Sequence, residues 1–282
     1  MIATRLEVDL PRRAFVAQIM GLPISIHVRG PGVRQSAVET AVERAFAALR
    51  FDEEVFSPWR PDSDISRIQR GDLSLAAAHP RVLEVARLCE QATALTGGAF
   101  SALLPGPDGR TVFNPTGLVK GWAVQSAFES LLAEPALRHH DAMINAGGDI
   151  AVQCQRTDTP DWTIAIEHPR DRHHLLRTLP LRGGAVATSG TAARGRHIIN
   201  PATGQPASDE LLSATVIGPS LIWADVYATA AYVRGRRALA WLATIPQHLG
   251  LLVTAEGTVL TAGAHAHAHA HAHAHAPDES RN

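Results

Sequence analysis

The sequence predicts an α+β fold, in which helices and strands follow one another in irregular order. Two observations indicate this class. Apolar residues recur at helical spacing in some segments, whereas in others they alternate or form short runs typical of strands. The order of these segments lacks the regular repeat of a doubly wound parallel sheet. With 282 residues, of which 45% are hydrophobic, the chain can form one large domain or two small ones. We predict two closely packed lobes within a folded domain at residues 15–263.

The first half of this domain is predicted to be mainly helical. An alternating segment indicates one strand, and apolar residues at helical spacing indicate the helices. Pro80 begins the second helix and Gly97-Gly98 follow its end, as is usual for helix termini. Residues 57–66, rich in Pro, Ser and Asp, are predicted to form a loop. The predicted elements are a strand at 24–29 and helices at 38–49, 80–95 and 118–132.

The second half is predicted to consist mainly of strands separated by glycine-rich turns. Its one helix is apolar on nearly all sides, which favours burial. The predicted elements are strands within 142–152 and at 162–167, 185–188 and 212–217, followed by a helix at 219–233.

Composition excludes several classes of protein. Lys and Arg number 26 against 27 Asp and Glu, so no strong positive field favours nucleic acid. Two cysteines cannot form a disulfide framework. There is no run of 18 apolar residues, and the first 18 residues carry five charges that interrupt any signal-peptide core. We therefore expect a cytoplasmic protein without a membrane span or a nucleic-acid partner.

Two glycine-containing segments are candidates for binding a ligand. Residues 114–121, Asn-Pro-Thr-Gly-Leu-Val-Lys-Gly, place a turn before a helix, where backbone groups and Lys120 can meet a phosphate. The alternative is a simple strand-to-helix turn. Residues 145–149, Asn-Ala-Gly-Gly-Asp, allow a ligand to approach the backbone closely. Their residues alone favour a tight hairpin turn, in which Asp149 bonds its own backbone.

Two further segments contain groups suited to catalysis. His197 precedes a Pro-Ala-Thr-Gly turn, and a histidine can exchange protons near neutral pH, although most single histidines are structural or solvated. Asp225 and Thr229 are four residues apart and project from one face of the last helix. Their oxygens suit a hard cation such as Mg²⁺. The alternative is that Thr229 bonds the Asp225 carbonyl while Asp225 pairs with a distant arginine.

In this order and spacing, the segments resemble the ApbE family of flavin transferases. The resemblance extends over residues 20–235 and includes the candidate segments above. Each motif is short, but the ordered set is specific. The motifs are Met20–Pro23, Ser57–Ser66, Thr96–Phe100, Gly117–Ala123, Asn145–Asp149, Ala187–Gly190, His197–Pro206, and the pair Ala224-Asp225 with Ala228-Thr229.

The resemblance implies an ApbE-like mixed fold and a metal-dependent transfer reaction. Members of this family bind FAD and a divalent cation, usually Mg²⁺. They transfer the FMN half of FAD to a Thr or Ser hydroxyl of an acceptor protein and release AMP. The implied partners here are therefore FAD and an acceptor protein, whose identity the sequence leaves open, as it does the oligomeric state.

The resemblance also implies roles for individual residues. Asp225 and Thr229 would bind the metal through side-chain oxygens, and Gly117 through its backbone carbonyl. His197 matches the family's general base. Ser101 and Asn114 stand where relatives usually carry acids. The residues implied to line the FAD site are Met20, Trp59, Ala99, Phe100, Ser101, Asn114, Lys120 and Ile199.

Two other functions remain open from the sequence. In an FAD pyrophosphatase, water would replace the acceptor hydroxyl, and the products would be FMN and AMP. A non-catalytic FAD-binding protein is compatible with Ser101 and Asn114. Residues 264–282 include an alternating Ala-His run with six histidines. We expect this tail to be disordered, with adventitious binding of Zn²⁺, Ni²⁺ or Cu²⁺ as the alternative.

Overall fold

The structure is a computed structural model that describes residues 10–106, 109–191, 195 and 197–263. The Ala-His tail at 264–282 lies outside these residues. Mixed helices and strands confirm the predicted α+β class, while the division into two lobes stays a prediction. No helix in the described ranges is long and apolar enough to cross a membrane.

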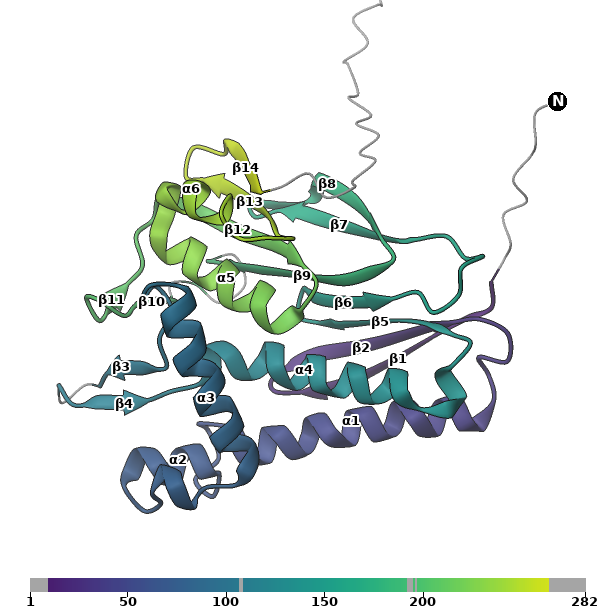
Figure 1. The fold of residues 1–282 in the computed structure, drawn as a ribbon, viewed down its shortest axis with the longest axis horizontal. Helices are drawn as coiled ribbons and strands as arrows, with labels where there is room; N and C mark the ends of the chain where they lie inside the picture. The colour runs from purple at the N-terminus through teal and green to yellow at the C-terminus, as the bar shows by residue number, and fades with distance from the viewer. Residues whose placement is uncertain (1–9, 107–108, 192–194, 196, 264–282) are drawn as a thin grey trace, which may run out of the picture.

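An eight-stranded antiparallel sheet forms the centre of the protein (Figure 1). Its strand order is β1-β2-β5-β6-β9-β12-β13-β14, so the chain leaves the sheet several times between neighbouring strands. The strand bounds are β1 Arg12–Ile19, β2 Leu22–Arg29, β5 Asp141–Ala146, β6 Asp149–Gln153, β9 Gly183–Gly190, β12 Leu211–Gly218, β13 Leu249–Thr254 and β14 Val259–Gly263.

Helices cover one face of this sheet. α1 and α4 pack against each other beneath the first strands, and α5 packs on β9 and β12 (Figure 1). α3 crosses α4, and α6 contacts β13 and β14. The helix bounds are α1 Ser36–Phe56, α2 Asp64–Arg70, α3 Pro80–Leu95, α4 Thr116–Ala133, α5 Leu221–Arg234 and α6 Ala238–Leu242.

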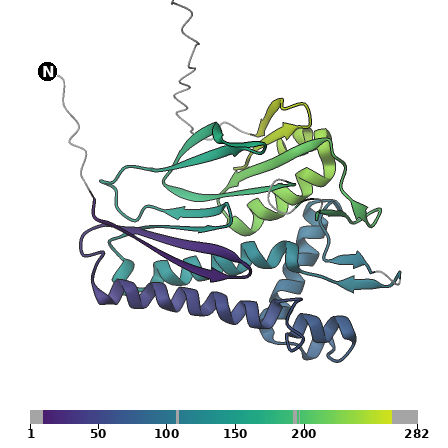
Figure 2. The same cartoon turned by 180° about the vertical axis from the view of Figure 1, so that it is seen from behind.

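A long hairpin packs on the opposite face of the sheet, seen from behind in Figure 2. It consists of β7 (Trp162–His168) and β8 (Asp171–Leu181). Ile166 and Leu179 of the hairpin pack with Leu251 and Val253 of β13. The sheet is therefore a middle layer between helices and this hairpin.

The alternation of side chains explains which face of the sheet the helices cover. In β2, every second residue from Leu22 to Val28 is buried, because successive side chains of a strand point to opposite faces. Helix α1 places its buried residues, from Val38 to Leu49, at helical spacing against this surface. Helix α5 buries nine of its residues, as its nearly continuous apolar sequence predicts.

Two short hairpins project from one end of the molecule (Figures 1 and 2). One consists of β3 (Leu103–Pro105) and β4 (Thr111–Phe113), which lead into α4. The other consists of β10 (Ile199–Asn200) and β11 (Gln205–Pro206), and follows β9. Gly204 packs closely on Pro105, so the two hairpins contact each other.

The structure corrects several predicted boundaries. Helix α3 has the predicted ends, and α4 differs by only one or two residues. Helix α1 continues to Phe56, well beyond the predicted residue 49. The predicted loop at 57–66 ends in α2, because the Ser63 hydroxyl accepts a hydrogen bond from Ser66 N and caps a helix there. The strands β1, β8, β13 and β14 and the short strands of the two projecting hairpins have no counterpart in the predicted set.

Candidate functional site

Two turns lie side by side at one end of the sheet. The turn between β1 and β2 contains Met20, and the turn between β5 and β6 contains Gly147 and Gly148. Ile24 pairs with Ala146, and Gly147 packs on Leu22. The two turns are therefore neighbours at the same end of the sheet.

The segment at the start of α4 brings three of the predicted residues together. Asn114 Oδ1 accepts hydrogen bonds from Thr116 N at 3.2 Å and Thr116 Oγ1 at 2.7 Å, which fixes the entry into the helix. Asn114 N donates to Ala102 O at 2.7 Å. A Cβ added to Gly117 would lie 3.1 Å from the Phe100 ring. The buried Phe100 ring thus packs under Gly117, and Asn114 holds the turn that leads to it.

A cluster of three charged residues lies one turn further along α4. Lys120 Nζ forms ion pairs with Asp149 Oδ2 of β6 and with Asp225 Oδ2 of α5, the latter at 3.1 Å. The carboxylates of Asp149 and Asp225 are 4% and 8% exposed, whereas Lys120 is 27% exposed. A ligand can therefore reach the cluster from the Lys120 side.

Glycine allows this close approach of α4 to α5. A Cβ added to Gly121 would lie 3.1 Å from Asp225 Oδ2, so a larger residue would displace the carboxylate. Gly117 lies one turn before Gly121, and residues three and four apart share a helix face. Gly117, Lys120 and Gly121 thus lie on the side of α4 that faces Asp225.

The cluster contains more negative than positive charge. Two buried carboxylates face one ammonium group, which leaves a net charge of −1 where burial disfavours an uncompensated charge. Within the described ranges, neither Oδ2 atom has a further hydrogen-bond donor. A cation bound beside Asp225 would compensate this excess.

The nearby oxygens suit a hard cation. Thr229 Oγ1 is hydrogen-bonded to Ser189 Oγ at 2.9 Å, one helical turn beyond Asp225. In the part of the chain that the structure describes, no group of three or more His, Cys, Asp or Glu residues forms a metal site. A cation here would instead have carboxylate, hydroxyl and carbonyl ligands, which Mg²⁺ accepts. The residues present fit such an ion.

One expectation from the residues alone was wrong, and the alternative interpretation of Asp225 and Thr229 is not observed either. Asp149 does not bond its own backbone: its Oδ1 accepts from Thr188 N at 3.1 Å, and its Oδ2 faces Lys120. Asn145 Oδ1 closes the hairpin turn instead, by accepting from Gly148 N. Asp225 pairs with a lysine rather than an arginine, and Thr229 bonds a hydroxyl rather than the Asp225 carbonyl. In each case the partner comes from a distant segment.

His197 follows β9 in the chain and is exposed. Its Nδ1 is 2.9 Å from Gly195 O. Because a carbonyl only accepts hydrogen bonds, Nδ1 carries the proton in a neutral ring, and Nε2 is left able to accept one. Ile199, two residues further on, pairs with Pro206 in the β10–β11 hairpin.

The remaining predicted residues lie outside the charged cluster. Met20 has a positive φ of 56°, and its N–H donates to Glu53 Oε1 at 2.9 Å. Ala99 and Ser101 flank the buried Phe100, and the Ser101 hydroxyl bonds the backbone of Leu103. Trp59 is 91% exposed in the segment between α1 and α2, and nothing in the contacts described links it to the charged cluster.

Sequence reasoning did not assign roles to three residues of the site. Asp149 and Ser189 stood inside motifs that carried the family resemblance, but their partners lie on other elements. Glu53 lies in α1, outside every motif, and holds the Met20 turn. Membership in a motif was the one sequence feature that could have indicated Asp149 and Ser189. No sequence feature indicated Glu53.

The fold is an antiparallel sheet with helices on one face, and an acidic cluster that suits a cation lies at its end. These features place the protein among α+β proteins that bind a ligand. Residues 20–105 and 104–253 match the model of the ApbE family. Because the match covers most of the chain, this protein belongs to the ApbE family.

The relatives that resemble this chain have consistent names. A Vibrio cholerae protein named FAD:protein FMN transferase is 25% identical over 77% of this chain and 79% of its own length. A Buchnera aphidicola protein of the same name is 33% identical, over 35% of this chain and 31% of its own length. Most such alignments are local and span about a third of the relative.

Solved structures share the fold. The ApbE protein of Thermotoga maritima superposes with a TM-score of 0.76 at 18% identity, over 89% of this chain and 97% of that one. The flavin transferase ApbE of Vibrio cholerae superposes with a TM-score of 0.73 at 24% identity, over 90% and 97%. The ApbE-like fold expected from the motifs is confirmed.

Proposed function

We propose that this protein is an FAD:protein FMN transferase that uses Mg²⁺. It transfers FMN from FAD to a Thr or Ser hydroxyl of an acceptor protein and releases AMP. The observation that carries the proposal is the Lys120–Asp149–Asp225 cluster, which is negative overall and lies beside the segments that the resemblance assigns to FAD. The names of the relatives support the same activity.

The residues around the start of α4 would hold FAD. Asn114 and the exposed Gly117 lie over the buried Phe100 ring, and Lys120 presents an ammonium group that attracts a pyrophosphate. The exposed ring of Trp59 is available to stack on a flat aromatic group of the ligand. The other residues assigned to this site are Met20, Ala99, Ser101 and Ile199.

Asp225 and Thr229, with the Gly117 carbonyl, would hold the cation. When bound, Mg²⁺ neutralises charge on the pyrophosphate and so assists departure of AMP. The protein contributes a buried carboxylate with excess negative charge, a hydroxyl on the same helix face, and Lys120 as a second cation.

His197 would act as the general base. Its Nε2 accepts the proton of the acceptor hydroxyl as that oxygen forms a bond to the phosphorus of the FMN half. The bond between this phosphorus and the bridging oxygen breaks, and the oxygen leaves with AMP. The Nδ1 bond to Gly195 O keeps the ring in the tautomer that this step requires.

Hydrolysis of FAD is the second candidate function. His197 is exposed, so water can reach the same Nε2 atom as a protein hydroxyl. Water attack would give FMN and AMP with the same metal ligands and base.

One experiment separates transfer from hydrolysis and from simple binding. The protein is incubated with FAD, Mg²⁺ and an acceptor domain with an exposed Thr, and proteins and nucleotides are analysed by mass spectrometry. Transfer predicts an acceptor that carries FMN through a phosphoester, together with AMP. Free FMN with unmodified acceptor would establish hydrolysis instead. Intact FAD after prolonged incubation would contradict both reactions.

A further inference from the structure

Asp149 has an arrangement that metal binding alone does not explain. Its Oδ1 is fixed by the backbone N–H of Thr188 in β9, at 3.1 Å. Its Oδ2 faces Lys120, which also contacts Asp225. The carboxylate is almost fully buried and rigidly held, whereas the lysine is a flexible chain with partial access to solvent.

The position of Lys120 creates a competition at Asp225. The ammonium lies 3.1 Å from the carboxylate oxygen that we propose as a metal ligand. A divalent cation at Asp225 repels this ammonium, because like charges at such distances in a partly buried site interact strongly. Lys120 must then move towards another anion or out to solvent.

We propose that Asp149 is a positioning residue that retains the Lys120 ammonium inside the site when Asp225 takes up the divalent cation. This inference rests on the proposed function. Asp149 provides a second anion for the ammonium, held in place by the Thr188 N–H. Metal and ammonium can then occupy the site together, and both face the pyrophosphate.

Net charge explains why two carboxylates are needed. With Asp149 present, the cluster carries −1 and attracts a cation. Without it, Lys120 and Asp225 form a neutral pair, and the incoming metal must displace the ammonium from its only partner in the cluster. Removal of Asp149 should therefore weaken metal binding even though Asp149 is not a ligand.

A double-variant cycle measures this role without catalysis. Binding of Mn²⁺ to the full-length protein is followed by the electron paramagnetic resonance signal of free Mn²⁺, in the absence of FAD. The variants are Asp149→Asn, Lys120→Met and the two combined. Asn keeps an acceptor for Thr188 N, and Met replaces the lysine by an apolar chain of similar length. The double variant restores the net charge of −1.

The expected pattern is weaker binding in one variant and recovery in the double variant. Asp149→Asn should raise the Mn²⁺ dissociation constant about tenfold, because the ammonium now neutralises Asp225. Lys120→Met should bind as tightly as the wild type or more tightly. The double variant should return to within about threefold of the wild type, given the usual scatter of charge effects.

The opposite pattern would overturn the proposal. If Asp149 were itself a ligand, the effects would be additive, and Lys120→Met would improve binding no more in the Asp149→Asn background than in the wild type. Equal Mn²⁺ affinity in the wild type and Asp149→Asn would also exclude the positioning role, even if transfer activity were intact. Absence of both Mn²⁺ binding and flavin transfer in the wild type would instead reject the proposed function, and with it this inference.

A matched control separates local from general charge effects. Asp158→Asn removes the same charge from a side chain that is 67% exposed and pairs with Arg156 beyond the other end of β6. Its Mn²⁺ affinity should equal that of the wild type. Thermal melting of each variant confirms that it is folded at the temperature of the titration.

Discussion

The two strands of the β5–β6 hairpin each begin with a buried aspartate, and the two aspartates have different surroundings. Asp141 begins β5, and Asp149 begins β6 at the other end of the hairpin; their side chains are 0% and 4% exposed. Asp141 Oδ2 accepts from Arg29 Nε at 3.0 Å, and its Oδ1 accepts from Arg156 N at 3.1 Å. Asp149 instead shares one lysine with a second carboxylate.

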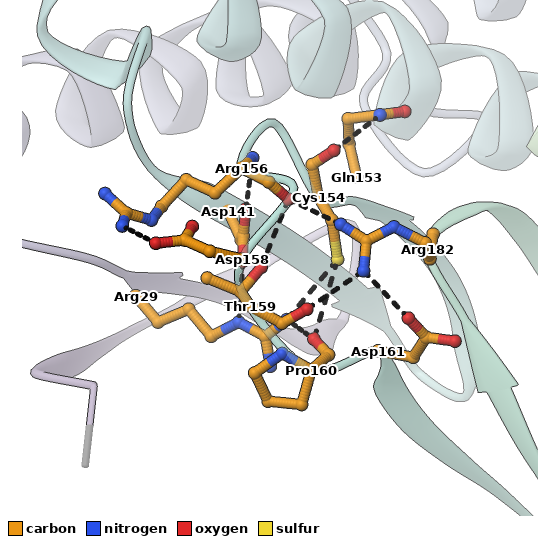
Figure 3. A network of polar contacts seen from close by, with 10 residues as sticks. All are labelled: Arg29, Asp141, Gln153, Cys154, Arg156, Asp158, Thr159, Pro160, Asp161 and Arg182. Carbon is orange, nitrogen blue, oxygen red and sulfur yellow. Dashed lines mark hydrogen bonds and ion pairs between the residues drawn. The ribbon is translucent and has the colours of Figure 1, made fainter. Parts of the chain in front are cut away.

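The surroundings of Asp141 form a closed network, shown in Figure 3. Arg29 also donates to Pro160 O and Cys154 Sγ, and its guanidinium lies 4.1 Å from the centre of the Trp162 ring. Arg182 donates to Thr159 O at 2.9 Å. These bonds fix the segment that connects β6 with β7.

The difference separates a carboxylate that stabilises the fold from one that we propose positions Lys120. A buried carboxylate with a donor on each oxygen stabilises the fold, because its charge is compensated within the protein. At the other end of the hairpin, two carboxylates share one lysine, and the proposed cation would complete the compensation. The same strand pair thus carries stability at one end and, we propose, catalysis at the other.

Replacement of Asp225 is expected to have the largest effect. Asp225→Asn preserves shape but removes the charge that holds the cation, so transfer should fall about 10³-fold, typical of a lost electrostatic contribution. Turnover at saturating FAD is measured across a range of Mg²⁺ concentrations. Wild-type rates at limiting Mg²⁺ would show that Asp225 is not a ligand.

Replacement of Asp141 should lower the stability of the fold and leave the transfer rate nearly unchanged. Asp141→Asn leaves the Arg29 guanidinium, only 11% exposed, without its carboxylate, and should reduce the free energy of unfolding by about 3 kcal/mol. Urea unfolding measures this loss. Turnover well below the melting temperature should remain within about twofold of the wild type. A large loss of activity in folded protein would contradict the distinction between Asp141 and Asp149.

Replacement of His197 should slow transfer while FAD still binds. His197→Ala removes the proposed base and should lower turnover about 10²-fold, at the low end of general-base effects. The FAD dissociation constant, measured by quenching of flavin fluorescence, should not change. A loss confined to affinity would make His197 a binding residue.

Two buried histidines should make the stability of the fold depend on pH, and this effect should be smaller than those of the three substitutions above. Burial lowers the pKa of His140 and of His248 below 6.5. The folded state therefore binds fewer protons than the unfolded state, so stability is complete above pH 6.5 and falls as pH decreases below it. The melting temperature should decrease from pH 7 to pH 5.5, and the decrease should be smaller in His248→Gln. A flat profile would contradict this prediction.

The sequence indicated local structure better than it indicated contacts between distant segments. Helix α3 was predicted with its observed ends because Pro80 and Gly97 mark them locally. The edge strand β1 was missed, since one of its faces is exposed and its pattern includes Arg12 and Arg13. Helix α2 was missed because it is short and its Ser63 cap lies in a polar segment.

The site shows the same limit. Asp225 and Thr229 could be chosen as candidates because a carboxylate in an apolar helix is conspicuous in a sequence. The pairing of Lys120 with Asp149 and Asp225 could not be predicted from the sequence. It joins α4, β6 and α5, which meet only in the folded protein.

Counting bound Mn²⁺ tests the contrast between the two ends of the hairpin most directly. The number of tightly bound Mn²⁺ ions per chain is determined by equilibrium dialysis for the wild type, Asp225→Asn and Asp141→Asn. We expect the wild type and Asp141→Asn to bind one more ion than Asp225→Asn. Equal binding by all three proteins, or loss of the ion only in Asp141→Asn, would contradict the account.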